Sequence, residues 1–80
     1  MNVYPNPAKE NVNVSFNATQ GLQYTINVID ITGRSLMVIS DVAVDGINEK
    51  MIDVKSLSSG IYNMVIKSAN GTEKVRLMVD

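Results

Sequence analysis

The sequence predicts an all-β fold, an antiparallel β-sandwich of six or seven short strands. Three observations lead to this prediction. Apolar residues recur at every second position in several segments, which is the pattern of a strand with one buried face. Clusters of Gly, Asn, Asp and Ser separate these segments at intervals of about ten residues. No segment carries the apolar repeat of an amphipathic helix.

The first half of the chain contains the clearest strand patterns. Residues 11–17 and residues 24–28 each alternate polar and apolar side chains without a break. Residues 30–34 predict a hairpin turn, because their Asp can accept backbone hydrogen bonds and their Gly can adopt a positive φ. Residues 35–40 form the return strand, whose apolar run does not indicate which side faces the core. Residues 41–46 add a short apolar stretch and a turn. The residues expected to face the core are Val12, Val14, Phe16, Tyr24, Ile26 and Val28.

The second half contains three more strand patterns. Residues 47–54 and residues 61–68 are joined by a tight connection that ends at Gly60, and residues 73–79 form the last strand. The Asn70-Gly71 pair predicts a type I′ hairpin, in which both central residues have a positive φ. The residues expected to face the core are Ile52, Val54, Tyr62, Met64, Ile66, Val75, Leu77 and Val79.

Residues 4–8 are expected to form an extended lead-in segment or a turn. Pro5 and Pro7 have no backbone N–H to donate, so this stretch should not pair as a strand. The whole pattern of short strands, polar turns and absent helices indicates a sandwich of immunoglobulin-like type.

Composition excludes several classes of function. The chain has 80 residues, with seven Lys and Arg against eight Asp and Glu, and its net charge of −1 argues against a nucleic-acid partner. It contains no His and no Cys, which rules out disulfides, thiolate or imidazole zinc sites and a Ser-His-Asp triad. No apolar run approaches the roughly 20 residues of a membrane-spanning helix. We expect no catalytic residue, no metal site and no cofactor.

Residues 1–80 are expected to be one domain excised from a longer exported protein. The length suits a single domain, and small all-β units of this kind commonly serve as appendages to larger chains. The N-terminus shows no signal peptide, since residues 1–5 have neither a basic region nor an apolar stretch behind them.

Several short motifs follow one another in an order that resembles a known family. Tyr4-Pro5-Asn6-Pro7 comes first, before an alternating strand that ends at Phe16. Asp30-x-x-Gly33-Arg34 and then Asp53-Val54-x-x-Leu57-x-x-Gly60-Ile61-Tyr62 follow, before a final Asn-Gly hairpin that carries Lys74. In this order and length, the motifs resemble the C-terminal sorting domain of the type IX (Por) secretion system, a type A sorting domain.

The resemblance implies that the domain is an address rather than an enzyme. Such domains direct the covalently fused upstream cargo from the periplasm through the outer membrane of Gram-negative bacteria, by way of an outer-membrane translocon. A sortase-like cysteine protease then usually removes the domain, and the cargo stays at the cell surface or is secreted. One departure concerns the tail, because Arg76 is the last cation and the chain ends at Asp80 without the terminal basic residue that is frequent in the family.

Each candidate recognition residue also has a structural interpretation. The candidates are Tyr4, Pro5, Asn6, Pro7, Asp30, Gly33, Arg34, Gly60, Tyr62, Lys74 and Arg76. The prolines could simply block edge pairing while Tyr4 covers the end of the core. Asp30, Gly33, Gly60 and Tyr62 suit turns and packing, whereas Arg34 is free to contact a partner. Lys74 and Arg76 are expected on the outer side of the last strand, where they either guard its edge or meet a receptor by strand addition.

Two alternative functions remain open on the residues alone. One is an accessory carbohydrate- or protein-binding module of a secreted hydrolase, which generally presents a row of exposed aromatic side chains. The other is a structural spacer, for which the charges of the last hairpin would be irrelevant to export. The carboxylates of Asp41, Asp45, Glu49 and Asp53 are expected to be solvated surface charges rather than a calcium site.

Overall fold

The computed structural model describes residues 1–80 and consists of β-strands without any helix. It therefore contains no helix long and apolar enough to cross a membrane. The seven strands are β1 (Asn2–Tyr4), β2 (Asn11–Ala18), β3 (Gln23–Ile29), β4 (Ser35–Val42), β5 (Gly46–Asp53), β6 (Gly60–Ser68) and β7 (Gly71–Val79).

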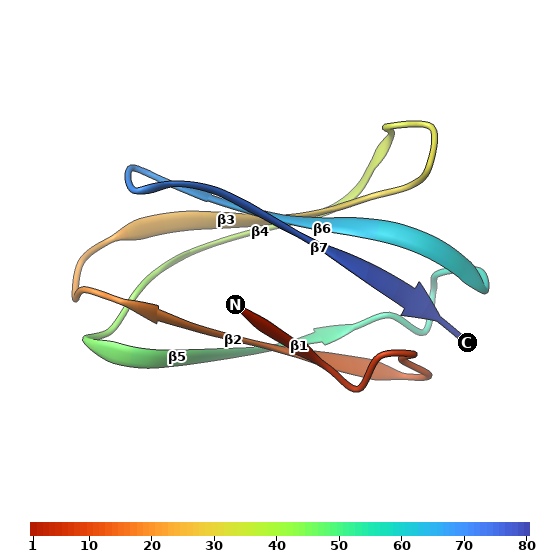
Figure 1. The fold of residues 1–80 in the computed structure, drawn as a ribbon, viewed down its shortest axis with the longest axis horizontal. Coiled ribbons are helices and arrows are strands. Elements are labelled where there is room, and N and C mark those ends of the chain that lie inside the picture. The colour runs from red at the N-terminus through yellow and green to blue at the C-terminus, as the bar shows by residue number, and fades with distance from the viewer.

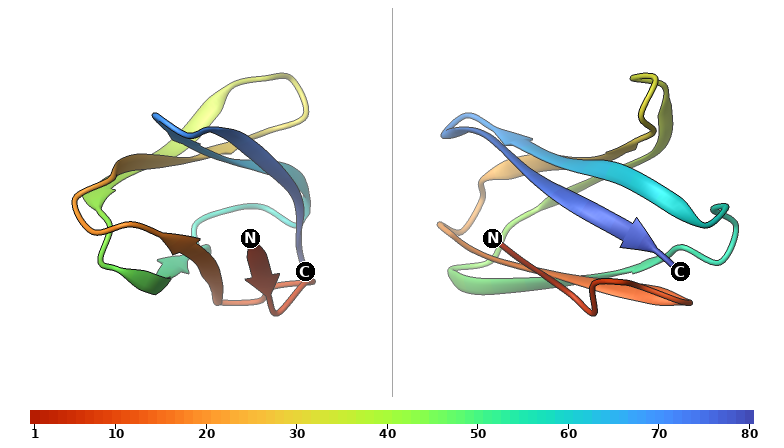
Figure 2. Two further views of the ribbon diagram at one scale, coloured as in Figure 1. Left: turned by 60° about the vertical axis from the view of Figure 1, so that its left-hand side comes forward. Right: turned by 45° about the vertical axis from the view of Figure 1, so that its right-hand side comes forward.

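The strands form two antiparallel sheets that pack face to face (Figure 1). One sheet has the order β1-β2-β5 and the other the order β4-β3-β6-β7. Figure 2 shows the two layers from other sides, with both chain ends near the same lateral margin of the sandwich. The predicted all-β antiparallel sandwich is confirmed.

Tyr62 adds a local feature of immunoglobulin-like sandwiches. It lies near the start of β6, after the chain has crossed from one sheet to the other, and its ring is buried. Its hydroxyl donates a hydrogen bond to the carbonyl oxygen of Ser58, at 2.5 Å. A tyrosine that bonds back to the backbone a few residues upstream at this corner is typical of the fold.

The core consists of side chains that alternate inward from both sheets. Its largest fully buried members are Ile26, Ile52, Met64 and Leu77. All but three of the residues expected in the core are buried. Phe16 and Ile66 are partly buried against the core, and Val75 is half-buried.

The orientation of β4, which the sequence left open, is settled by its pairing with β3. Met37 and Ile39 pack against the core, whereas Leu36 and Val38 lie on the outer face with 38% and 60% of their surface exposed. β4 is an edge strand, so this outer face meets solvent at the margin of the four-stranded sheet.

The last hairpin lies where the sequence predicts it, but the predicted type I′ turn is wrong. Ser68 pairs with Gly71, which makes Ala69 and Asn70 the two turn residues. Gly71 has a φ of +128°, and no residue other than Gly has a positive φ. In this register the positive φ falls on Gly71, which has no Cβ to oppose it, and Asn70 keeps a negative φ.

The N-terminal segment is more ordered than the sequence predicts. Pairing with β2 extends β1 as far as Tyr4, and strand structure stops at Pro5. Ala8 then forms an isolated parallel bridge with Val79 of β7. The expectation that residues 4–8 are unpaired is therefore correct for Pro5 and Pro7, and it is wrong for Tyr4 and Ala8 at the two ends.

Candidate recognition surface

The N-terminal segment is tied to the edge of β7 by four hydrogen bonds. The Asn6 amide nitrogen donates to the carbonyl oxygen of Arg76 at 2.9 Å, and the Met78 N–H donates to the Asn6 Oδ1, also at 2.9 Å. The Ala8 N–H donates to the Met78 carbonyl oxygen at 2.8 Å, and the Asp80 N–H donates to the Ala8 carbonyl oxygen at 2.7 Å. We call residues 6–8 the clasp, because they cover this half of the β7 edge.

Asn6 can do this because its side chain ends in a carboxamide. This group carries one acceptor and one donor side by side, as a peptide group does, so it satisfies two backbone groups of an edge strand. The chain bends at Pro5 and Pro7, on either side of Asn6, and neither proline belongs to a strand. The structure thus brings Asn6 together with the backbone of Arg76, although 70 positions separate them.

Tyr4 does not cover the end of the core. It pairs with Asn13 across β1 and β2, and its side chain lies on the outer face of the three-stranded sheet with 46% of its surface exposed. Its hydroxyl donates a long hydrogen bond of 3.5 Å to Glu49. The expectation for Tyr4 is wrong because the alternation along β1 turns Val3, rather than Tyr4, toward the core.

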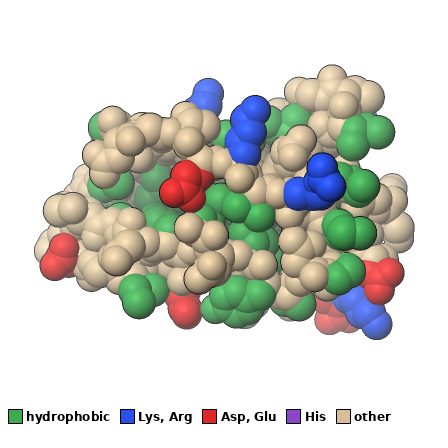
Figure 3. Space-filling view, viewed as in Figure 1, with side chains coloured by type: hydrophobic (Ala, Val, Ile, Leu, Met, Phe, Trp, Pro, Cys, Tyr) green, Lys and Arg blue, Asp and Glu red, His purple; other side chains and the backbone are tan.

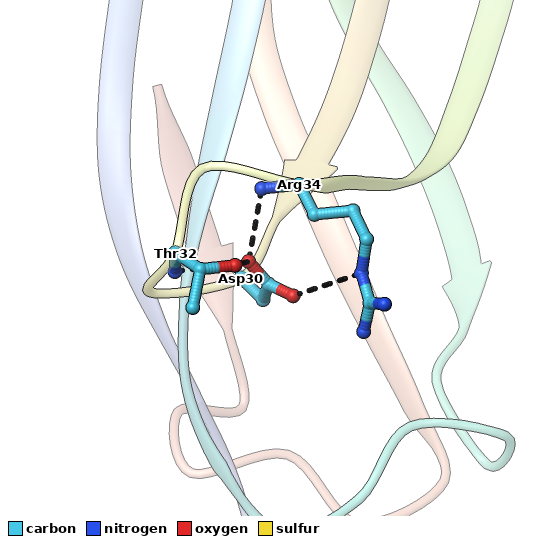
Figure 4. A network of polar contacts seen from close by, with 3 residues as sticks. All are labelled: Asp30, Thr32 and Arg34. Carbon is cyan, nitrogen blue, oxygen red and sulfur yellow. Dashed lines mark hydrogen bonds and ion pairs between the residues drawn. The ribbon is translucent and has the colours of Figure 1, made fainter.

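The β3–β4 loop is held by the carboxylate of Asp30 (Figure 4). The Oδ1 atom accepts hydrogen bonds from the Thr32 hydroxyl at 2.6 Å, the Arg34 N–H at 2.9 Å and the Thr32 N–H at 3.0 Å. Its Oδ2 atom lies 3.3 Å from the Nε of Arg34. Gly33 has a φ of +90° and completes the turn by donating its N–H to the Asp30 carbonyl oxygen.

These contacts lower the pKa of Asp30 below its ordinary value. The largest cause is the hydrogen bond from the Thr32 hydroxyl, followed by the one from the Arg34 N–H, while burial acts in the opposite direction. The Arg34 side chain remains 76% exposed, and in Figure 4 its terminal guanidinium nitrogens point away from Asp30. The loop therefore presents an oriented cation to solvent.

Lys74 and Arg76 lie on the outer face of the four-stranded sheet, as the sequence predicts. Both are exposed, and neither makes an ion pair. Lys67 of β6 lies on the same face as Lys74. Lys67 pairs with Thr72, two residues before Lys74 in β7, and Lys74 itself pairs with Val65. Figure 3 shows Lys and Arg side chains gathered over this sheet in the upper half of the view.

Lys67 belongs to this basic face but was not among the sequence candidates. The alternation of residues 61–68 predicts that Lys67 points outward. The register of the last hairpin then places Lys67 close to Lys74. Both signals are present in the sequence. The two remaining candidates lie at the start of β6, where Gly60 is the first residue and the Tyr62 ring is buried in the core.

Seven of the candidate residues lie in two separate groups, whereas Tyr4, Pro5, Gly60 and Tyr62 belong to neither group. The clasp, Lys74 and Arg76 lie at the β7 edge, whereas Asp30, Gly33 and Arg34 form the β3–β4 loop, and no hydrogen bond or ion pair joins the two groups. The largest depression, with a volume of about 690 Å³, is lined by residues of β3, β4 and β6 such as Thr25, Ser40 and Lys67 and by none of the candidates.

Two observations bear on the alternative of a carbohydrate-binding module. Tyr4 is the only exposed aromatic side chain, so there is no row of aromatic rings. Phe16 and Tyr24 instead pack edge to face between the sheets, with ring centroids 4.8 Å apart.

The comparison with protein families decides the identity. The family model described as a secretion system C-terminal sorting domain matches residues 2–80. The chain belongs to this family. Searches of curated proteins and of solved structures returned no match.

Membership in the family assigns the general function. The sorting domain is a C-terminal signal for export by the type IX secretion system, so it interacts with the secretion machinery and takes its cargo through the outer membrane to the cell surface or the medium. The family is one of signals rather than of catalysts.

Proposed function

We propose that residues 1–80 are the C-terminal unit of a longer exported protein, and that the outer-membrane translocon reads this sorting domain at its β7 edge. The cargo crosses the periplasm before this step. A sortase-like cysteine protease then removes the domain. The observation that carries the proposal is the pair of hydrogen bonds by which Asn6, from the Tyr4-Pro5-Asn6-Pro7 motif, joins the backbone of the last strand.

The unpaired basic side chains on the outer face of β6 and β7 support recognition at the β7 edge. Lys67, Lys74 and Arg76 have no carboxylate partner, so their charges are available to an acidic receptor surface at little cost to folding. The clasp occupies the second half of the β7 edge, while no hydrogen bond from the N-terminal segment reaches the outward backbone groups before Arg76. A receptor can therefore approach the outer face and the first half of β7 without displacing the clasp.

The test is export of a reporter. A signal peptide, a fluorescent reporter and residues 1–80 are fused in that order and expressed in a bacterium with a type IX system. We expect the reporter at the cell surface or in the medium. Retention of the reporter in the periplasm, with the domain folded, would contradict the proposed function.

A charge reversal separates recognition from folding. The variant Lys74→Glu with Arg76→Glu should reduce export at least severalfold, while its melting temperature moves by only a few degrees, as exposed substitutions usually allow. The matched control is Lys9→Glu with Lys55→Glu, which changes the net charge equally at exposed sites away from the basic face. Equal export of the two double variants would show that the basic face is not the signal.

A further inference from the structure

β1 covers only part of the β2 edge with which it pairs. Asn2, the first residue of β1, pairs with Ser15, and the same register sets Met1 opposite Phe16. β2 continues beyond this point to Ala18. On its other side β2 pairs with β5 along its full length, without any shift of register. The end of β2 therefore has a partner strand on one side only.

The unpaired backbone groups at this end belong to Asn17. The Val54 N–H donates to the Glu10 carbonyl oxygen at 2.8 Å, so the backbone groups of Glu10 face β5. In antiparallel pairing, the N–H and C=O of successive residues point to opposite sides of a strand. Since the register of β2 is unbroken, the N–H and C=O of Asn17 face the β1 side, just beyond the start of β1. No turn or loop backbone group bonds to them there.

A depression of about 290 Å³ lies beside these groups. It is lined by Met1 and Asn17 from one side and by Tyr24 and Ile66, of β3 and β6, from the other. Figures 1 and 2 show the start of β1 between the two sheets in every view. There is therefore room for more chain along the course that β1 would take if it were longer.

Glu73 of β7 lies on the opposite side of the start of β1. Its Oε2 is 3.4 Å from the nitrogen of Met1. Because the groups of Asn2 face β2, the Met1 nitrogen faces away from β2 and toward this carboxylate. In a longer chain the Met1 nitrogen is a peptide N–H, which is still a donor directed at Glu73. Continuation of the chain is therefore compatible with the contact that holds Met1.

We propose that the chain ahead of Met1 continues β1 along the free end of β2. The residue directly before Met1 pairs with Asn17 through two backbone hydrogen bonds, and the residue two before Met1 lies opposite Ala18. The Met1 side chain packs against the core, so alternation turns the next side chain outward and the one before it into the depression. An apolar side chain suits this second position, because Leu22 and Ile66 line the depression.

The existence of this upstream chain rests on the proposed function, in which residues 1–80 follow a cargo. The free groups of Asn17 and the depression are properties of residues 1–80 themselves. The occupant is identified by covalent continuity, since the chain ahead of Met1 already begins at the open end of the site. Its local concentration there exceeds that of any separate chain.

Hydrogen exchange at the Asn17 amide, measured by NMR, tests the continuation directly. The domain with Thr-Val-Ser added ahead of Met1 is compared with the domain that starts at Met1. We expect the Asn17 amide to exchange about tenfold or more slowly in the extended domain, because its N–H gains a partner. The control extension is Thr-Val-Pro, in which Pro directly before Met1 has no N–H to donate to the Asn17 carbonyl oxygen. With this control, exchange at Asn17 should stay close to that of the unextended domain.

The order of the added side chains tests the alternation. Thr-Val-Ser and Thr-Ser-Val have the same composition, but only the first places Val in the depression. We expect the Thr-Val-Ser domain to melt a few degrees higher, because it buries more apolar surface. Equal melting temperatures would show that the side chains are not placed as proposed.

Three results would overturn the continuation itself. One is equal exchange of the Asn17 amide with and without Thr-Val-Ser, and another is equal protection by Thr-Val-Ser and Thr-Val-Pro. The third is a domain starting at Met1 that sediments as a dimer with a protected Asn17 amide, which would assign the β2 edge to a second copy. None of these measurements involves export, so such a result would leave the reporter test of the sorting function unaffected.

Discussion

A single carboxylate determines the conformation of the β3–β4 loop. Asp30 accepts three hydrogen bonds from Thr32 and Arg34, so the loop is ordered before any partner arrives. The turn was predictable from Asp30 and Gly33, since both residue types have a known role in turns. The orientation of Arg34 was not, because it depends on which carboxylate oxygen remains free after the loop has formed.

Asp30 should make stability depend on pH in the acid range. In the folded state the pKa of Asp30 lies below its ordinary value of 3.8. The ionised carboxylate therefore contributes fully to the free energy of unfolding above pH 3.8. This contribution is lost as the pH falls through the lower pKa of the folded state. Asp30→Asn has no such transition, and its thermal midpoint should fall less than that of the unaltered domain between about pH 5 and pH 2. Thermal melts followed by circular dichroism across this range measure the difference.

Asp45→Asn is the control, because the Asp45 side chain makes no hydrogen bond or ion pair. It should melt with the pH profile of the unaltered domain. A profile for Asp30→Asn that also coincides with the unaltered domain would contradict the role given to the Asp30 carboxylate.

At the scale of elements, the two edges of the four-stranded sheet differ. The clasp covers the second half of β7, while Leu36 and Val38 are exposed apolar side chains of β4 at the other edge. Most strands were predictable, because residues 11–17 and residues 24–28 alternate so regularly that only one face can be buried. The clasp was not, because it joins segments at opposite ends of the chain and no local pattern records such a contact.

Removal of the Asn6 side chain should open the β7 edge. Asn6→Ala deletes two hydrogen bonds to β7, and we expect the free energy of unfolding to fall by about 1–2 kcal/mol. The Met78 amide should then exchange with solvent faster, while amides in β3 stay protected. Hydrogen exchange measured by NMR tests both points.

Asn11→Ala provides the comparison, since the exposed Asn11 side chain makes no hydrogen bond. It should leave exchange at Met78 unchanged. Slow exchange of the Met78 amide in Asn6→Ala would mean that Ala8 alone holds the clasp in place.

At the scale of the whole molecule, one small core holds both sheets together. The chain has neither disulfides nor an assembled set of metal-binding residues, so burial of aliphatic side chains must provide the stability. A domain of this size is expected to unfold with a free energy of about 4–12 kcal/mol. The core residues were foreseen from alternation, because alternation determines which side chains of a strand face inward.

Ile26→Ala should remove a large part of this stability. Ile26 is fully buried between the sheets, and truncation of such a side chain costs about 2–5 kcal/mol. Urea denaturation should show a lower midpoint with an unchanged slope. Ile47→Ala, at a position that is 70% exposed, should stay within about 0.5 kcal/mol of the unaltered domain. Equal effects at the two positions would contradict the division between core and surface.

The clasp also limits where a protease can cut this chain. Peptide bonds between residues 6 and 8 belong to a segment whose polar groups are engaged with β7, so this segment must detach before a cleft can accommodate it. Hydrolysis on the N-terminal side of β1 would leave residues 6–8 in place and the sandwich intact, with its last strand still fastened to them.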